Sequence, residues 1–341
     1  MTAVIRYLDR AAVIRCGGWD FHKAIADVEE AFRLQESGQT VMPPEVPLRW
    51  PNPVASSEFS GAPLSDAGIY ALPAYVGGER PVVGIKWTSH RSKKIKSELP
   101  HTMGLIVLND ATTGCPIAVV ESGLIGAVRT ASVSGLAIAC LGWSKARSIA
   151  VFGAGFQAES HLRMLAQQFP GLEVVWLVNR TRERAEDLAA RIGAEAPWPI
   201  RIQPMGYDAF LKNDVVITCT SAEEPFVARS WVRPGLLAIH VGLFEYQFDA
   251  IAAFDRVVVD KWGEFKHTSF KSLFRMYRAG QFREEDVYGH LGEFVAGTKK
   301  KFQGQSVFFN SFGLSIFDVA VAWRIVREAQ SLSDGQELPL L

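Results

Sequence analysis

The first forty residues carry two hydrophobic patterns, one typical of a strand and one typical of a helix. The run IRYL at 5–8 predicts a short strand. The segment FHKAIADVEEAFRLQESG at 21–38 repeats apolar residues at spacings of three and four, and Gly38 marks its end. We therefore expect an amphipathic helix that packs through one face.

Prolines and short apolar runs replace the helical pattern from Met42 to about Val120. The prolines come first: Pro43, Pro44, Pro47, Pro51 and Pro53. Four runs follow, separated by turn residues such as DATTG at 110–114: IYALPAYV, PVVGIKWTS, GLIVLND and PIAVVE. Short runs of this kind between turn signals predict a twisted antiparallel or mixed sheet.

From residue 129 onward the chain alternates between helical and strand patterns. A helical stretch rich in small residues, RTASVSGLAIACLGW, is followed by five strand-like runs: SIAVFGAG, VVWLV, DVVITCT, LLAIHVG and RVVVD. Helices are expected at about 157–168 and 182–192. Such alternation predicts a parallel sheet with crossover helices. The last segment, FGLSIFDVAVAWRIVREAQSL at 312–332, predicts a helix that returns to the first domain.

Length and charge narrow the class of protein. A chain of 341 residues favours two domains. Its 36 basic and 36 acidic residues balance, which argues against nucleic acid or an anionic membrane as a partner and favours a small molecule. Charged residues interrupt the apolar start, so we expect no signal peptide, no spanning helix and a cytosolic location. The scattered cysteines, Cys16, Cys115, Cys140 and Cys219, predict neither a disulfide nor a metal site.

A glycine motif lies between the strand SIAVF and the helix that follows it. Gly153, Gly155 and Ala158 form a GxGxxA turn. The first glycine permits a tight turn, the second lets a pyrophosphate approach the backbone, and the small third residue lets helix and strand pack closely. We therefore predict a nicotinamide dinucleotide over residues 153–157, which are Gly153, Ala154, Gly155, Phe156 and Gln157.

The end of the second strand bears on the choice between NAD(H) and NADP(H). VVWLV is followed by Asn179, Arg180 and Thr181 and lacks the acid that binds a ribose 2′-hydroxyl. An arginine matches a 2′-phosphate as a charged fork. We expect NADP(H) to be preferred, with NAD(H) possible. The alternative is that Arg180 lies solvated on a loop while NAD(H) binds through other contacts.

Four stretches of the chain resemble ornithine cyclodeaminase, mu-crystallin and their relatives: GIKWTS at 84–89, residues 104–137 with RTAS, VFGAGFQAESH at 151–161 and VNRT at 178–181. In the segments GIKW, LNDATTGCPIAVVE and RVVVDKW, the residues most resemble those of the members that oxidise N-(1-amino-1-carboxyl-2-ethyl)glutamic acid to release 2,3-diaminopropionate. The resemblance implies an α/β protein. Residues 129–317 would form a Rossmann-type doubly wound nucleotide domain, and 1–128 with 318–341 an α+β substrate-binding and dimerisation domain.

The resemblance also implies site residues. Lys86 and Arg129 match positions that bind a substrate carboxylate, and Lys86 stands beside the reacting carbon as a catalytic group. Both residue types suit the task, because arginine grips a carboxylate through two donors and lysine also moves a proton. Arg49 is the nearest candidate for a further carboxylate ligand. Thr130, Thr220 and Ser311, with Gly313, match cofactor positions. For each cation, the alternative is a surface side chain.

Two residues depart from the family pattern. Glu245, after HVGLF, stands where cyclodeaminases carry an aspartate, and Phe317 replaces a glutamate. Glu245 could carry protons, since the ring of Phe244 would favour its neutral form, or it could be a loop glutamate in water. His101 is either a polar substrate contact or a turn cap. The basic run RSKKIK at 91–96 is expected to be a solvated loop.

These inferences predict an NAD(P)-dependent oxidoreductase that transfers hydride at the carbon–nitrogen bond of an amino acid, secondary amine or imine. Two alternatives stay open. One is a redox-neutral deaminating cyclase of the ornithine cyclodeaminase type. The other is an NADPH-binding protein of the mu-crystallin type with reduced catalysis, which the departures at Glu245 and Phe317 favour and the retention of Lys86 and Arg129 opposes. The family resemblance implies a homodimer.

Overall fold

The computed structural model describes residues 4–50, 67–91 and 98–341. Pro51, Pro53 and most of the basic run at 91–96 lie outside these residues. The chain divides into two compact units. Unit 1 contains residues 1–19, 37–126 and 314–341, and unit 2 contains residues 20–36 and 127–313.

Unit 1 is built on a mixed sheet, which has eight strands among the described residues. Its strands are β1 (Val4–Leu8), β2 (Thr40–Val41), β3 (Val46–Leu48), β4 (Gly68–Val76), β5 (Val82–His90), β6 (Thr102–Asp110), β7 (Pro116–Glu121) and β16 (Gln336–Pro339). The order is β16-β1-β7-β6-β5-β4-β2, and β3 pairs with β4. Only β1 and β7 are parallel among the pairs described. The four predicted runs are thus strands β4 to β7, and the predicted turn at 110–114 joins β6 to β7.

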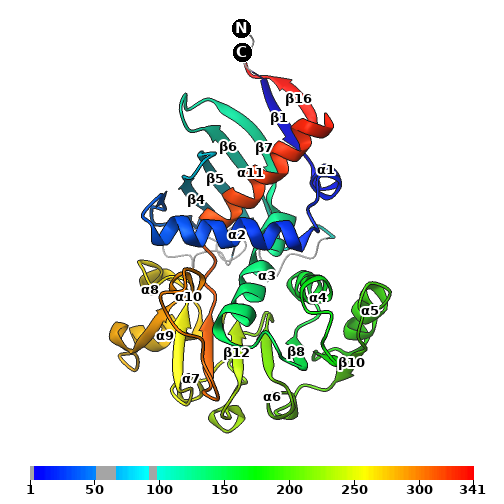
Figure 1. Ribbon diagram of the computed structural model, residues 1–341, viewed down its shortest axis with the longest axis vertical. Coiled ribbons are helices and arrows are strands. Elements are labelled where there is room, and N and C mark those ends of the chain that lie inside the picture. Colours follow the sequence, from blue (N-terminus) through cyan, green and yellow to red (C-terminus); the bar gives the residue numbers. More distant parts are fainter. Residues whose placement is uncertain (1–3, 51–66, 92–97) are drawn as a thin grey trace, which may run out of the picture. The chain divides into compact units, whose positions relative to one another are not determined.

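Helix α11 (Ser315–Leu332) covers one face of this sheet, as Figure 1 shows. It packs on β4, β5, β6 and β7, so the last helix does return to the N-terminal part of the chain. Phe317 is fully buried in this layer. The short helix α1 (Arg10–Arg15) follows β1, and Asp9 caps it by accepting the Ala12 amide at 2.8 Å.

Unit 2 contains the predicted parallel sheet. Its strand order is β10-β9-β8-β11-β12-β15-β13-β14. The bounds are β8 (Ser148–Phe152), β9 (Val174–Val178), β10 (Ile200–Gln203), β11 (Val215–Thr218), β12 (Leu237–His240), β13 (Arg256–Val259), β14 (Val287–His290) and β15 (Val307–Asn310). The first five positions follow the 3-2-1-4-5 order of doubly wound dinucleotide-binding domains, and β15, the last strand of the unit along the chain, takes the sixth position next to β12. β8, β11 and β12 are almost wholly buried, which explains their continuous apolar runs.

Unit 2 also contains helices, which Figure 1 labels. They are α2 (Phe21–Glu36), the larger part of α3 (Ser122–Leu141), α4 (Phe156–Gln168), α5 (Arg182–Gly193), α6 (Asp208–Lys212), α7 (Phe248–Ile251), α8 (Phe265–Thr268), α9 (Ser272–Arg278) and α10 (Leu291–Val295). The unit to which α2 belongs differs from the prediction, which placed residues 20–36 in the N-terminal domain. It groups with unit 2 because it packs on α4 and α10, and the Phe21 amide donates to the Gln167 side chain.

Helix α3 corrects two expectations. It begins at Ser122 rather than near residue 129, because the carboxylate of Glu121 accepts the amides of Gly123 and Leu124 at 2.8 and 3.1 Å and so caps its first turn. It is also long and apolar enough, by composition, to span a membrane, which the sequence argument had excluded. However, 78% of its most apolar window is buried inside the protein, as in a core helix.

Candidate functional site

The glycine turn has the geometry that its sequence predicts. Gly153 follows β8 with a φ of 112°, and a Cβ there would lie 2.6 Å from the carbonyl oxygen of Cys219, so only glycine fits. Gly155 precedes α4, and no side chain caps this helix end. A Cβ on Gly155 would meet no atom within 4 Å. The backbone above Gly155 is therefore open to an anion.

The end of β9 lies beside this turn. The Gly153 amide donates to the carbonyl of Val178 at 2.8 Å, and the Asn179 side chain donates to the carbonyl of Thr181 at 2.7 Å. Arg180 is exposed between them. The structure thus brings the two parts of the predicted dinucleotide site together.

A buried histidine that the sequence argument did not single out fixes the start of α4. His161 Nδ1 lies 2.7 Å from the Gln157 carbonyl oxygen, and Nε2 lies 2.9 Å from the hydroxyl of Ser134 on α3. Burial lowers the pKa of His161 to about 4, so the ring is neutral at pH 7. A neutral ring donates from Nδ1 and accepts at Nε2, which ties the first turn of α4 to α3.

A cavity of about 230 Å³ lies at the carboxyl ends of β11, β12 and β15. Several predicted site residues line it together. The Oε1 atom of Gln157 is buried and accepts no hydrogen bond from a described residue, so it is available to a ligand donor. The lining consists of Arg129, Thr130, Gln157, Cys219, Thr220, Val241, Gly242, Leu243, Lys271, Ser311 and Phe312.

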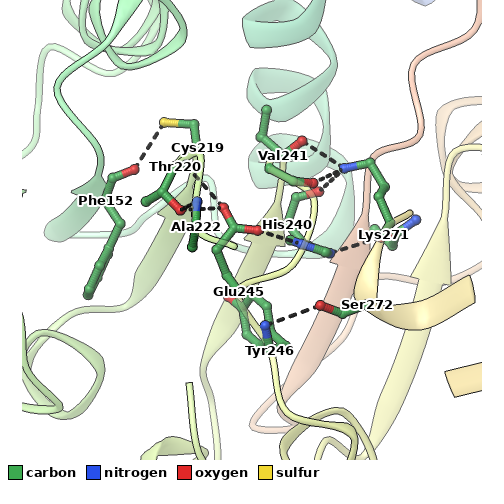
Figure 2. A network of polar contacts seen from close by, with 12 residues as sticks. Phe152, Cys219, Thr220, Ala222, His240, Val241, Glu245, Tyr246, Lys271 and Ser272 are labelled. Carbon is green, nitrogen blue, oxygen red and sulfur yellow. Dashed lines mark hydrogen bonds and ion pairs between the residues drawn. The ribbon is translucent and has the colours of Figure 1, made fainter. Parts of the chain in front are cut away.

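Glu245 lies next to this cavity but does not line it. One carboxylate oxygen accepts the amide and the hydroxyl of Thr220, both at 3.0 Å, and the other lies 2.8 Å from His240 Nε2 (Figure 2). His240 Nδ1 lies 3.0 Å from the amide oxygen of Asn310. Burial lowers the pKa of His240, and the positive charge of Lys271 lowers it further. Thr220 is therefore the link between this network and the cavity.

Both environments considered for Glu245 need revision. It is fully buried, so it is not a loop glutamate in water. Its two oxygens have polar partners. The ring of Phe244 instead contacts Arg275, whose Cζ atom lies 3.9 Å from the centre of that ring. Gly242 makes room for the carboxylate, because a Cβ there would lie 1.8 Å from Oε1.

Arg129 is positioned by a glycine that the sequence argument had carried over from the family. Gly313 has a φ of 98°, and a Cβ on it would lie 2.3 Å from Arg129 Nη1. Its amide donates to Oδ2 of the buried Asp260 at 2.7 Å. Asp260 ends the run RVVVD, and no local pattern around it indicates that it would hold this turn.

Lys86 belongs to unit 1. Its ammonium donates to Asp318 of α11 at 2.8 Å, and the two side chains are 12% and 0% exposed. A Cβ on Gly126 would lie 3.1 Å from Lys86 Nζ, so glycine leaves space for the ammonium. Asp318 was not predicted, although it follows Phe317, the residue noted as a departure. Lys86 is thus a paired, largely buried cation rather than a solvated one.

The remaining candidates of unit 1 lie close to one another. Arg49 donates to the hydroxyl of Tyr70 at 3.1 Å. The ring of Tyr70 contacts His90 edge-on, with ring centres 5.2 Å apart, and His90 contacts His101 in the same way at 5.9 Å. Burial, together with the charges of His101, Lys86 and Arg49, lowers the pKa of His90 to about 4. His101 therefore joins a cluster of polar rings.

Comparisons with known proteins agree with this fold. The family model described as ornithine cyclodeaminase/mu-crystallin matches residues 18–333. An N-((2S)-2-amino-2-carboxyethyl)-L-glutamate dehydrogenase of Staphylococcus aureus is 26% identical over 100% of both chains. A rat ketimine reductase mu-crystallin is 28% identical over 74% of this chain and 77% of its own. The structure of an archaeal alanine dehydrogenase dimer with bound NAD has a TM-score of 0.85, 26% identity, and coverage of 99% of this chain and 100% of that chain.

The named relatives are dehydrogenases and a reductase, which agrees with the class of enzyme predicted from the sequence. The doubly wound sheet and the glycine turn agree with the predicted fold. The chain is an oxidoreductase that belongs to the ornithine cyclodeaminase/mu-crystallin family.

Proposed function

We propose that this enzyme transfers hydride between a nicotinamide dinucleotide and a carbon that bears both nitrogen and a carboxylate, in an amino acid, a secondary amine or the corresponding imine. One observation carries the proposal. Arg129, a cation suited to a carboxylate, lines the same cavity as Thr130, Thr220 and Ser311, beside the glycine turn. In a doubly wound sheet of this order, that cavity corresponds to the nicotinamide end of the dinucleotide.

The residues present fit such a cofactor. The open backbone over Gly155 and the uncapped start of α4 suit a pyrophosphate. The unpartnered Oε1 of Gln157 and the hydroxyls of Thr130, Thr220 and Ser311 suit a carboxamide and a ribose. When bound, the nicotinamide supplies or accepts the hydride. The protein's part is to orient the cofactor and the substrate.

Lys86 and Arg129 would bind the substrate carboxylate, with Arg49 as a further ligand. The Lys86 ammonium is held by Asp318 at 2.8 Å, so it is fixed in one geometry before substrate arrives. Lys86 would also donate a proton to the substrate nitrogen or accept one from it. Glu245 would act through Thr220, because its carboxylate fixes the direction of the Thr220 hydroxyl.

An oxidoreductase fits the cavity better than a cyclodeaminase. Cyclisation needs an acidic group that assists attack of the substrate's own amine on the imine. Among the described residues that line the cavity, none is a carboxylate. The relatives named above include a dehydrogenase of a carboxylated secondary amine and a ketimine reductase. Interconversion of amine and imine needs hydride transfer at carbon and a proton at nitrogen, and no internal attack by a second amine.

The proposal is tested by incubating the protein with NADPH or NADH and a panel of 2-oxo acids mixed with ammonia or primary amines. Loss of the absorbance of the reduced cofactor, dependent on both the acid and the amine, is the expected result. The reverse panel contains amino acids with oxidised cofactor, and released ammonia is followed in parallel. Ammonia without net reduction of the cofactor would instead identify a cyclodeaminase.

We propose further that NADP(H) is the preferred cofactor and that Arg180 is responsible. Arg180→Ala should weaken binding of NADPH by roughly tenfold to a hundredfold, the usual range for a lost hydrogen bond to a charged group, and should leave NADH nearly unaffected. Fluorescence titration of both cofactors measures this. The neighbouring Arg182 pairs with Glu186 at 2.7 Å, so Arg182→Ala serves as the matched control. Equal losses of affinity for NADPH and NADH would show that Arg180 does not bind the 2′-phosphate.

We propose that the protein is a homodimer formed through the sheet of unit 1. Side chains alternate along β5: Gly84 and Lys86 face α11, since a Cβ on Gly84 would lie 3.0 Å from Val319 and Lys86 pairs with Asp318. Val83 and Trp87 therefore face away, 38% and 49% exposed, with Leu105 opposite Trp87 and 40% exposed. The archaeal alanine dehydrogenase at 26% identity is a dimer.

Trp87→Asp should convert the dimer into a monomer, because a charge at the centre of an apolar interface is desolvated without a partner. Light scattering after gel filtration reads the mass directly. Leu332, at the end of α11, is 55% exposed, so Leu332→Asp provides an apolar-to-acidic control that should remain dimeric. A Trp87→Asp variant that keeps the mass of the wild type would place the interface elsewhere.

A further inference from the structure

The cavity contains a buried lysine for which the proposed reaction has no use. Lys271 directly precedes α9, is 4% exposed and lines the cavity together with Arg129. Lysine is seldom buried unless its ammonium has partners. The position of this one therefore calls for a reason.

Its partners are successive carbonyl oxygens of the turn that follows β12. Lys271 Nζ donates to the carbonyls of His240, Val241 and Gly242 at 3.3, 2.7 and 2.6 Å, and Figure 2 shows the ammonium inside this arc. The next carbonyl, of Leu243, accepts the Ser272 amide at 2.8 Å. An ammonium has three protons, and three carbonyls receive them. The cation thus holds one wall of the cavity in place.

The charged side chains that line the cavity, among the described residues, are both cations. Glu245 and Asp260 favour its charged form, and Arg129 opposes it. Neither carboxylate lines the cavity: Glu245 binds Thr220 and His240 behind it, and Asp260 accepts the Gly313 amide. Among the described residues that line the cavity, two are cations and none is an anion.

The two redox forms of a nicotinamide differ in charge, because the oxidised ring is a cation and the reduced ring is neutral. A positive charge in the cavity therefore affects their binding differently. We propose that Lys271, given the cofactor site proposed above, makes the cavity select the reduced nicotinamide over the oxidised one. When both forms are present, the enzyme is then loaded for imine reduction rather than amine oxidation. A ligand shifts such an equilibrium only through its differential interaction, and a fixed positive charge supplies one.

The same geometry predicts in which direction a substitution of Lys271 changes the preference for the reduced cofactor. Removing the ammonium withdraws a positive charge and also leaves three carbonyl oxygens without their donor, and both changes make the cavity more negative. Lys271→Met and Lys271→Gln should therefore lower the ratio of the dissociation constants of NADP⁺ and NADPH, or of NAD⁺ and NADH. A unit charge a few ångströms from another in a partly buried site changes an equilibrium by roughly tenfold or more. Lys271→Arg keeps the charge and should keep most of the ratio.

The experiment is titration of all four cofactors into the purified full-length protein by fluorescence or calorimetry. Lys212→Met is the matched control, because Lys212 lies in the same unit with its side chain 64% exposed. A fall in the ratio for the Met and Gln variants, with no change for Lys212→Met, supports the proposal. Equal losses of affinity for both redox forms would overturn it, since a purely structural lysine weakens both alike. Wild-type protein that binds none of the four cofactors would instead overturn the proposed function itself.

A pH series on wild-type protein tests the proposal even if Lys271→Met does not fold. Burial lowers the pKa of Lys271 to about 8. The ammonium is charged below that pH and neutral above it, so the preference for the reduced cofactor should decline as the pH rises through about 8. Burial raises the pKa of Cys219, so that thiol does not lose its proton in this range. The Gln variant should show a flat ratio over the same range. A flat ratio in the wild type would contradict the assignment.

Discussion

Replacing Arg129 by alanine is expected to remove most of the turnover while leaving the affinity for reduced cofactor nearly intact. Arg129 lines the cavity at the carboxyl ends of β11, β12 and β15, and we assign its guanidinium to the substrate carboxylate. Truncating one partner of a desolvated charge pair costs about 2 to 5 kcal/mol, so kcat/KM should fall by roughly 30-fold to several thousand-fold. Steady-state kinetics with the best substrate of the panel, and titration of reduced cofactor, measure the two effects separately.

Two comparisons sharpen this prediction. Arg129→Lys keeps the charge but loses the fork of donors, so it should restore only part of the activity. Arg147, which pairs with Glu173 on the surface, provides the control, and Arg147→Ala should behave as wild type. A substrate amide lacks the negative charge, so wild type acting on the amide should resemble Arg129→Ala acting on the acid. Equal turnover of amide and acid by the wild type would contradict the assignment of Arg129 to the substrate carboxylate.

Gly155→Trp is expected to abolish dinucleotide binding without unfolding the protein. A Cβ at Gly155 meets no atom within 4 Å, so the free protein has room for a side chain there. That room is the place assigned to the pyrophosphate, and an indole would fill it. Affinity should fall by roughly a hundredfold or more, the equivalent of losing at least two charge-assisted hydrogen bonds.

Gly171 provides the matched control, because a Cβ on it also meets nothing within 4 Å and it lies beyond α4, away from the glycine turn. Gly171→Trp should bind cofactor as wild type does, and both variants should melt close to the wild-type temperature. A Gly155→Trp variant that binds NADPH normally would show that the pyrophosphate lies elsewhere.

The sequence was sufficient to predict those features whose residues are close together along the chain. The GxGxxA turn needed only its own residues and the strand before it, because the constraint on Gly153 is a backbone angle. The strands β8, β11 and β12 could be recognised from apolar runs of buried parallel strands. The cavity likewise gathers Thr130, Thr220 and Ser311, three residues that the family resemblance had supplied.

Contacts between distant segments could not be read from the sequence. Asp318 pairs with Lys86 across 232 positions, and Asp260 holds the Gly313 amide across 53. Lys271 lies in a stretch, KHTSFKSLFRMYR, that looks like an ordinary basic surface. Only the fold shows that its ammonium turns inward to the carbonyls of residues 240–242. The same holds for Glu245, whose burial depends on Thr220 and His240 and on the absence of a side chain at Gly242.

The central claim is hydride transfer to a carbon bearing nitrogen and a carboxylate, and isotope transfer tests it most directly. The enzyme is incubated with a cofactor that carries deuterium at the transferring position of C4 of the reduced nicotinamide, and with the imine formed from a 2-oxo acid and an amine. We predict that the amino acid or secondary amine formed carries one deuterium at Cα, as read by mass spectrometry and NMR. A product without deuterium at Cα, or no product although the cofactor binds, would contradict the claim.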